Sequence, residues 1–317
     1  MTYSVRCKRL QGACSETGYT LIELMIAVAV LMIVSASVFN GVQQLTQVSA
    51  TVHNRSEMHA GVRNATELLQ QEIGQAGRIA LPQAVWLMAP VVGDPTAVIV
   101  QPVPVNDVTG LFVGEQVLVD AGLSQETVAI TAIAGLIISG VFVNDHLVNT
   151  PVDVQGGFTS GVVPTAASGT VNGSTDTVLK IFGDINSDGN MVYVEYTCDA
   201  LVTNNLYRNS MPFTAGVKNP PTVAQVLLNN VQPNPDGAAC FIYQQVSVSG
   251  TTYVTDVAVT LTVQTERRDP VTGLFQMETK ALLNVSPRNV FQVWQMASLN
   301  INSRLQPMPA SVTALLP

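Results

Sequence analysis

Charged side chains are scarce in this chain. Its 317 residues include 14 Lys and Arg and 22 Asp and Glu, so 11% of the residues are charged and the formal net charge is −8. Charged residues make up about a quarter of an average soluble protein. No cluster of Lys or Arg follows the first ten residues. Because phosphate backbones are neutralised by clustered basic residues, a general nucleic-acid-binding function is excluded, and no direct contact with nucleic acid is expected.

Catalytic patterns are missing as well. The sequence contains no HExxH zinc motif, no GxSxG nucleophile elbow, no P-loop and no CxxC pair. We therefore predict no catalytic residues and no enzyme activity. Disorder is excluded because 47% of the residues are hydrophobic, and disordered chains lack that apolar mass. Abundant Val and Thr, with Gly and Asn for turns, favour a β-rich fold.

One long apolar run stands near the N-terminus. Residues 24–54 contain no Asp, Glu, Lys or Arg, and residues 21–39 form a stretch of 19 residues rich in Leu, Ile, Val and Met. At a rise of about 1.5 Å per residue, this stretch nearly matches a hydrocarbon core of about 30 Å. Arg6, Lys8 and Arg9 precede it. We therefore predict a membrane-spanning helix, with the rest of the chain outside the cytoplasm.

The order of residues before this run differs from that of an ordinary signal peptide. A signal peptide has its small-residue cleavage site after the apolar stretch, whereas Gly18 comes before it. In addition, Glu23 lies inside the apolar stretch. An ionised carboxylate near hydrocarbon costs about 2.5–3.5 kcal/mol, so Glu23 needs a partner or a purpose.

Residues 18–25 read GYTLIELM, which resembles the processing site of type IV prepilins and type II secretion pseudopilins. In that family a membrane-embedded prepilin peptidase cuts after the Gly on the cytoplasmic face and N-methylates the new terminus. The resemblance implies that Gly18 ends a leader and that Tyr19 is the methylated first mature residue, a position where Phe is commoner. It implies that Glu23 pairs with the terminal amine of a neighbouring subunit. The residues implied in recognition and assembly are Thr20, Leu21, Ile22 and Glu23. The alternative is a plain signal anchor with a chance Glu.

Residues 41–81 predict a continuation of the helix as a stalk. Apolar residues recur at spacings of three to four, no Pro occurs before residue 82, and Leu81 and Pro82 stop the pattern. The predicted polar face carries Arg55, Glu57, Arg63, Glu67 and Glu72. Residues 63–78 resemble the stalk of PilW-type minor pilins. The alternative is any amphipathic helix that packs on a sheet.

After Pro82 the apolar period changes from about 3.6 to 2, which indicates strands. We predict a hairpin from residues 257–263 and 277–285 across a turn at 267–273, a strand pair at 177–182 and 191–197, and a strand at 241–243. A small β insert is predicted at 111–154, with strands near 116–119, 127–133 and 136–143. The predicted helix near the end covers residues 289–304.

The predicted fold class is therefore α+β and pilin-like. A long N-terminal membrane-spanning helix would pack on a mostly antiparallel β-sheet domain. The predicted parts are a cytoplasmic leader (1–18), the transmembrane half of the helix (19–40), an amphipathic stalk helix (41–81), an exoplasmic β-rich domain (82–305) and a tail (306–317).

Cys198 and Cys240 are an even pair in an exported domain, whereas Cys7 and Cys14 lie in the predicted leader. A disulfide between Cys198 and Cys240 would close a 43-residue loop over the Pro-rich residues 200–236, which we expect to be irregular. The chain-entropy model gives about 4 kcal/mol for such a loop. The alternative is two buried free thiols.

A second motif fits the calcium-loop pattern D-x-[DN]-x-[DN]-G-x5-E. Its candidate ligands are Asp184, Asn186, Asp188, Asn190 and Glu195. The pattern places hard oxygen ligands at alternate positions, and Gly189 allows the sharp turn. Because strands rather than helices flank it, the alternative is a polar hairpin turn, since Asp, Asn and Gly favour turns for their own reasons. Calcium is the one cofactor that the sequence suggests.

The resemblance implies a structural function: a minor pilin that primes assembly of a type IV pilus or caps it. Its implied partners are prepilin peptidase, other minor and major pilins, the bacterial inner membrane and the pilus assembly platform. The implied location is the inner membrane, single-pass, with the globular domain outside the cytoplasm, and then the pilus filament or its tip. One alternative is a type II secretion minor pseudopilin. Another is a membrane-anchored exoplasmic binding protein or enzyme that uses a prepilin-like signal.

The junction between Gly18 and Tyr19 can be tested directly. Mass spectrometry of the mature protein should show N-methylated Tyr19 as the first residue. Loss of three positive charges and one negative charge with the leader leaves 11 Lys and Arg against 21 Asp and Glu, a net charge of −10. Replacing Gly18 with Ala or a larger residue should leave the leader attached. A mature N-terminus located after the apolar run would contradict the prepilin interpretation.

Overall fold

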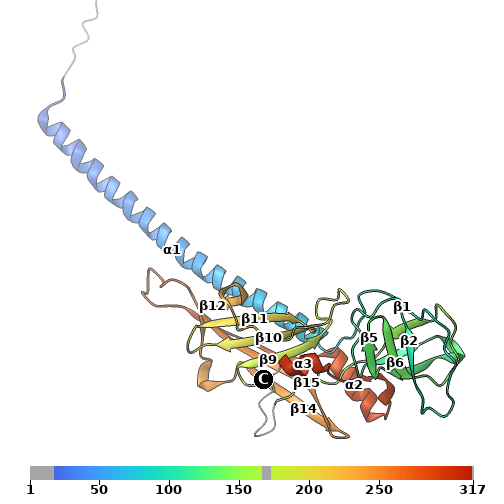
Figure 1. The fold of residues 1–317 in the computed structure, drawn as a ribbon. Helices are drawn as coiled ribbons and strands as arrows, with labels where there is room; N and C mark the ends of the chain where they lie inside the picture. Colours follow the sequence, from blue (N-terminus) through green and yellow to red (C-terminus); the bar gives the residue numbers. More distant parts are fainter. Residues whose placement is uncertain (1–17, 166–172, 316–317) are drawn as a thin grey trace, which may run out of the picture.

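One long helix runs from the N-terminal end of the described chain into a β-rich body (Figure 1). The structure is a computed structural model and describes residues 18–165 and 173–315. Helix α1, Leu21–Gln75, has 55 residues and is therefore about 80 Å long. The predicted leader lies outside the described residues, except for Gly18. The architecture is α+β and mostly antiparallel, so the predicted fold class is confirmed.

Two antiparallel sheets form the part of the body that packs on α1. Their strands are β9 Val178–Gly183, β10 Val192–Asp199, β11 Asn205–Pro212, β12 Val226–Asn229, β13 Val231–Gln232, β14 Phe241–Val248, β15 Thr251–Gln264 and β16 Met277–Val285. The first sheet has the order β12-β11-β10-β9. The second has the order β13-β15-β14, with β16 paired to β15. The predicted β9–β10 pair and the predicted β15–β16 hairpin are confirmed.

The last third of α1 packs against both sheets. Its buried apolar residues recur every three or four positions, so they form one stripe along the helix. The stripe consists of Met58, Val62, Ala65, Leu69 and Ile73. These residues belong to one hydrophobic cluster with the inward-facing residues of both sheets. Full burial of a Val, Leu or Ile side chain contributes about 1.5–3 kcal/mol, so the stripe determines where the body attaches to the helix.

Helix α1 ends at Gln75, before the predicted end at residue 81. The helix ends early because of contacts with the body rather than because of the local sequence. The N–H of Gly77 donates to the carbonyl of Phe182 (2.8 Å), and the carbonyl of Gly77 accepts from the N–H of Phe158 (2.9 Å). Gly77 has a φ of +82°, and a Cβ there would lie 2.8 Å from the side chain of Val290. The predicted stalk boundary was therefore wrong, because the chain leaves the helix at Gly77 to join the body.

Residues 85–154 form a second β unit with its own hydrophobic core. Its strands are β1 Val85–Trp86, β2 Val100–Pro104, β3 Gln116–Val119, β4 Glu126–Ala129, β5 Ala132–Ala134, β6 Ile137–Val141 and β7 Pro151–Val154. They form two sheets with the orders β1-β7-β3-β4 and β2-β6-β5. The predicted insert at 111–154 began too late, because β1 pairs with β7 and β2 pairs with β6. The predicted strand at 127–133 is split between the two sheets. Figure 1 shows this unit near the C-terminal end of α1.

The C-terminal segment is packed rather than free. It contains α2 Arg288–Ser298, β17 Leu305–Gln306 and α3 Ala310–Leu315, and β17 pairs in parallel with β8 Gly157–Phe158. The side-chain amide of Gln306 donates to the carbonyls of Gln116 and Gln155, both at 2.8 Å. Val312 and Leu315 are buried. The prediction of a tail from residue 306 is therefore corrected for residues 306–315.

A buried carboxylate links α1 to the first sheet. The sequence places Glu72 on the polar face of the stalk, but the side chain is buried. Its Oε2 accepts from the hydroxyl of Tyr196 on β10 at 2.6 Å, and its Oε1 accepts from the guanidinium of Arg208 on β11 at 2.6 Å. Arg208 neutralises the charge of Glu72. A buried carboxylate is costly unless it is paired and hydrogen-bonded in this way.

Loss of this carboxylate should weaken the junction between helix and sheet. Glu72→Ala leaves the hydroxyl of Tyr196 and the guanidinium of Arg208 without their acceptor. We expect the free energy of unfolding, measured by chemical denaturation in detergent, to fall by about 3–5 kcal/mol. Glu67→Ala, at an exposed position on the same helix, is the control and should leave stability nearly unchanged. Equal small losses in both variants would show that the cluster does not hold the helix to the sheet.

Candidate functional site at the start of the long helix

The first turn of α1 is closed by a reciprocal cap between Thr20 and Glu23. The N–H of Glu23 donates to the hydroxyl oxygen of Thr20 at 3.4 Å. In return, the backbone N–H and the hydroxyl of Thr20 donate to Oε2 of Glu23 at 3.0 and 2.9 Å. This capping box satisfies helix N-terminal groups that would otherwise have no partner. It starts the helix at Leu21 and holds the carboxylate of Glu23 against the first turn.

The predicted cleavage junction lies directly before this cap. Gly18 and Tyr19 are outside regular secondary structure, and both are exposed. The side chain of Tyr19 contacts little of the described chain, with 90% of its surface exposed. The junction is therefore sterically open to a peptidase, and cleavage after Gly18 stays a prediction.

The N-terminal half of α1 presents an uncovered apolar surface. All residues from 21 to 50 are exposed, and this is the one described helix that is long and apolar enough to cross a membrane. Three hydroxyl groups on this part of α1 donate to carbonyls one turn earlier on the same helix, so they have a partner without water. These are Ser37 to Ile33 (3.0 Å), Thr46 to Val42 (2.8 Å) and Thr51 to Gln47 (3.1 Å). Such internal satisfaction suits an apolar environment.

A family model for the prokaryotic N-terminal methylation motif matches residues 14–39. The matched residues include the predicted junction, the Thr20–Glu23 cap and most of the exposed apolar helix. Over these residues the chain is similar to the N-terminal segment of type IV pilin-like proteins. The motif implies processing by prepilin peptidase and association with other pilins, and with α1 it fits a membrane-anchored single-pass protein with an external domain. No curated protein and no solved structure matches the chain.

A disulfide connects the two sheets of the body. Cys198 lies in β10 of the first sheet, and Cys240 lies directly before β14 of the second. Their sulfur atoms are bonded at 2.07 Å, so the predicted bridge is confirmed. The loop that it closes was expected to be irregular at residues 200–236. It instead contains β11, β12 and β13.

Most of the predicted calcium ligands lie in the β9–β10 turn. Asp184 is fully buried, with Oδ1 accepting from the N–H of Asp188 (3.0 Å) and Oδ2 lying 3.4 Å from Nε of Arg78. Oδ1 of Asp188 accepts from the N–H of Asn190 at 2.8 Å. Asn186 occupies the same turn. These contacts stabilise a hairpin turn by themselves, which is the alternative that the sequence left open.

Glu195 is not brought to that turn. It lies opposite Lys180 in the β9–β10 register, whereas Val192, three residues earlier, lies opposite Gly183 next to the turn. Three residues of strand separate the positions by about 10 Å. Both carboxylate oxygens of Glu195 lie 2.6 Å from the ammonium group of Lys218. The predicted ligand role of Glu195 is therefore corrected. Among residues 18–165 and 173–315, no group of three or more His, Cys, Asp or Glu is placed to hold a metal ion.

The sequence gives no indication of a polar cluster inside the second β unit. His146 is fully buried between two carboxylates. Its Nε2 lies 2.6 Å from Glu126, and its Nδ1 lies 3.2 Å from Asp120. Glu115 is also fully buried, and burial raises its pKa to about 8 although the N–H of Phe112 donates to it. Asp120 and Glu126 are at least 20 residues from His146 in sequence, and no motif indicates that Glu115 is buried.

Calcium binding at the turn stays a prediction that calorimetry can test. Titration of the mature protein in detergent with calcium should give one site, which Asp184→Ala and Asp188→Ala abolish, because these carboxylates are its hard oxygen ligands. Glu195→Ala is the matched control and should leave that heat unchanged, since Glu195 lies away from the turn. The absence of any binding heat at millimolar calcium would leave the turn as a purely structural feature.

Proposed function

We propose that this chain is a minor pilin of the PilW type, a structural subunit that primes assembly of a type IV pilus or caps it. The observation that carries the proposal is the division of α1 into two parts. Residues 21–50 are all exposed and include the apolar run of residues 21–39, whereas the stripe from Met58 to Ile73 is buried against the chain's own body. The exposed part has to find apolar surroundings elsewhere, first in a bilayer and then among the same helices of neighbouring subunits.

The position of the body supports a filament subunit. Both sheets attach only to the last third of α1, so the body leaves the first 30 residues of the helix accessible on all sides. A helix that is free all round can be surrounded by other helices while the body stays outside the bundle. Residues 63–78, whose sequence resembles the stalk of PilW-type minor pilins, lie within the buried part.

Glu23 is the remaining polar feature of the exposed half. Between residues 19 and 52 it is the one titratable side chain on α1. In the single chain its carboxylate is held by Thr20. Cleavage after Gly18 would free the amine of Tyr19, which directly precedes the Thr20 cap that holds the carboxylate. In a filament this amine would pair instead with the Glu23 carboxylate of a neighbouring subunit, and in a low-dielectric core such charge pairing sets the axial register.

A type II secretion minor pseudopilin shares the motif and the helix. The PilW-like stalk and the second β unit favour the pilus. Detection of the processed chain in purified pili, together with loss of piliation when it is deleted, would support the proposal. Loss of protein secretion with normal piliation would support the pseudopilin. A normal phenotype for both processes would indicate an anchored binding protein or enzyme.

The role of Glu23 provides a sharper test. Glu23→Ala should leave the amount of protein in the membrane fraction unchanged or increased, because an apolar residue replaces a charge. Its amount in the filament fraction should fall several-fold, because the charge that sets the register is lost. Ser35→Ala, on the same exposed helix and without a change of charge, is the matched control. Equal incorporation of Glu23→Ala and the wild type would show that the carboxylate does not direct assembly.

A further inference from the structure

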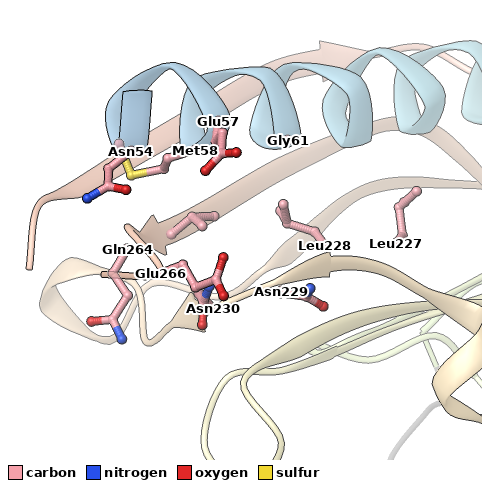
Figure 2. Close-up of a pocket in the computed structure, with 11 residues that line it drawn as sticks. Asn54, Glu57, Met58, Gly61, Leu227, Leu228, Asn229, Asn230, Gln264 and Glu266 are labelled. Carbon is pink, nitrogen blue, oxygen red and sulfur yellow. The ribbon is translucent and has the colours of Figure 1, made fainter. Parts of the chain in front are cut away.

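The turn of the β15–β16 hairpin points along α1 toward its N-terminal half. Glu278 on β16 forms an ion pair with His59 of α1. Farther along the hairpin, Gln264 and Glu266 line a groove together with Asn54, about one helical turn nearer the N-terminus (Figure 2). The hairpin and the helix therefore run side by side, and the turn at residues 267–275 continues in the direction of the apolar half of α1 (Figure 1).

Simple geometry gives the position of this turn relative to the predicted membrane span. From Glu278 to Leu274 the chain covers at most about 13 Å, which corresponds to about nine residues of helix. The end of the hairpin therefore lies beside residue 50 of α1, and the apolar run ends at residue 39. The separation is about 16 Å along the axis. The headgroup layer fills about 5–7 Å of it. Long side chains and helix tilt can span the rest.

The exposed side chains of the turn are of two kinds. Val271 and Leu274 each have 66% of their surface exposed, and Phe275 is exposed as well. Arg267 and Arg268 are exposed and are the one adjacent pair of basic residues after residue 18. The guanidinium of Arg268 lies 5.0 Å from the ring centroid of Phe275. Arginine beside exposed aliphatic and aromatic side chains is the composition of protein segments that bind at membrane interfaces.

One of the two acidic residues near the turn is kept from its outer surface. Asp269 is buried, and its Oδ1 accepts from the N–H groups of Val271 and Thr272, both at 2.8 Å. Its Oδ2 accepts from the side chain of Gln276 at 2.6 Å. These bonds also hold the turn in one shape. Glu266 is exposed and lines the groove beside α1, so the exposed charges near the turn are two arginines against one carboxylate, on a chain whose net charge is −8.

We propose that this turn rests on the surface of the membrane that α1 crosses, before the subunit enters a filament. The arginines, which have the longest side chains of the turn, contact anionic lipid headgroups. The proposal rests on the proposed function only in requiring that α1 spans a bilayer. It gives the anchored subunit a second membrane contact, which limits the rotation and tilt of the body relative to the membrane.

The experiment uses the processed chain in lipid vesicles, which has lost Cys7 and Cys14 with the leader, so that the introduced cysteine is the one free thiol. A fluorophore is attached at Thr272→Cys in the turn or, as the matched control, at Ser249→Cys in the turn at the opposite end of β15. Vesicles contain phosphatidylethanolamine with phosphatidylglycerol, or phosphatidylcholine alone. Headgroup-labelled quencher lipids report contact. We expect several-fold stronger quenching at residue 272 than at residue 249, and stronger quenching in the anionic vesicles.

A pair of charge variants tests the mechanism. Arg267→Ser with Arg268→Ser should reduce quenching at residue 272 toward the level of residue 249. Arg288→Ser with Arg304→Ser makes the same change of charge at exposed positions away from the turn, and this variant should leave the quenching at residue 272 unchanged.

Equal quenching at both labels while α1 resists carbonate extraction would overturn this proposal alone. Release of the chain by carbonate would overturn the proposed function as well. Crosslinking of residue 272 to a second subunit in place of lipid quenching would assign the turn to subunit contacts.

Discussion

The contact between the last third of α1 and the two sheets is the interaction on which the rest of the molecule depends. The apolar stripe from Met58 to Ile73 is almost entirely covered, and Glu72 adds a neutralised carboxylate within the same interface. Because this contact holds the body at one end of the helix, the other end can remain an uncovered apolar rod. The same helix therefore serves two environments. Water and protein surround its C-terminal part, and its N-terminal part requires lipid or other helices.

Features with a local cause could be predicted from the sequence. The prepilin-like motif GYTLIELM is recognised from eight consecutive residues. The Thr20–Glu23 cap forms between two residues of that same segment. Alternation of apolar residues identified β15, because one face of that strand is buried, and the turn signal at residues 267–273 identified its hairpin with β16. The Cys198–Cys240 bridge followed from the number of exported cysteines.

Features with a distant cause could not. Leu81 and Pro82 look like the end of the helix, but the backbone of Gly77 joins Phe182 and Phe158, which are far away in sequence. Glu72 reads as a surface residue, because its partners Tyr196 and Arg208 are more than one hundred residues distant. The C-terminal residues are weakly periodic, and they pack because the side chain of Gln306 donates to the carbonyls of Gln116 in β3 and of Gln155 directly after β7.

Charge is distributed unequally along the long axis of the protein. The second β unit contains seven Asp and Glu, and no Lys or Arg occurs between Arg78 and Lys180. At the end of the body nearer the apolar half of α1, the β15–β16 turn exposes two arginines. A negative membrane surface repels the first region and attracts the second. Both effects orient the body so that its acidic β unit points away from the bilayer.

The Cys198–Cys240 bond has a mechanical consequence. It joins the end of β10 in one sheet to the start of β14 in the other, and α1 packs across both sheets. A force applied along α1 loads the two sheets through their shared core, where non-covalent contacts alone would allow one sheet to slide past the other. The covalent bond prevents that separation at its end of the sheets. Tension along α1 would then be carried partly by this covalent bond and partly by the shared core.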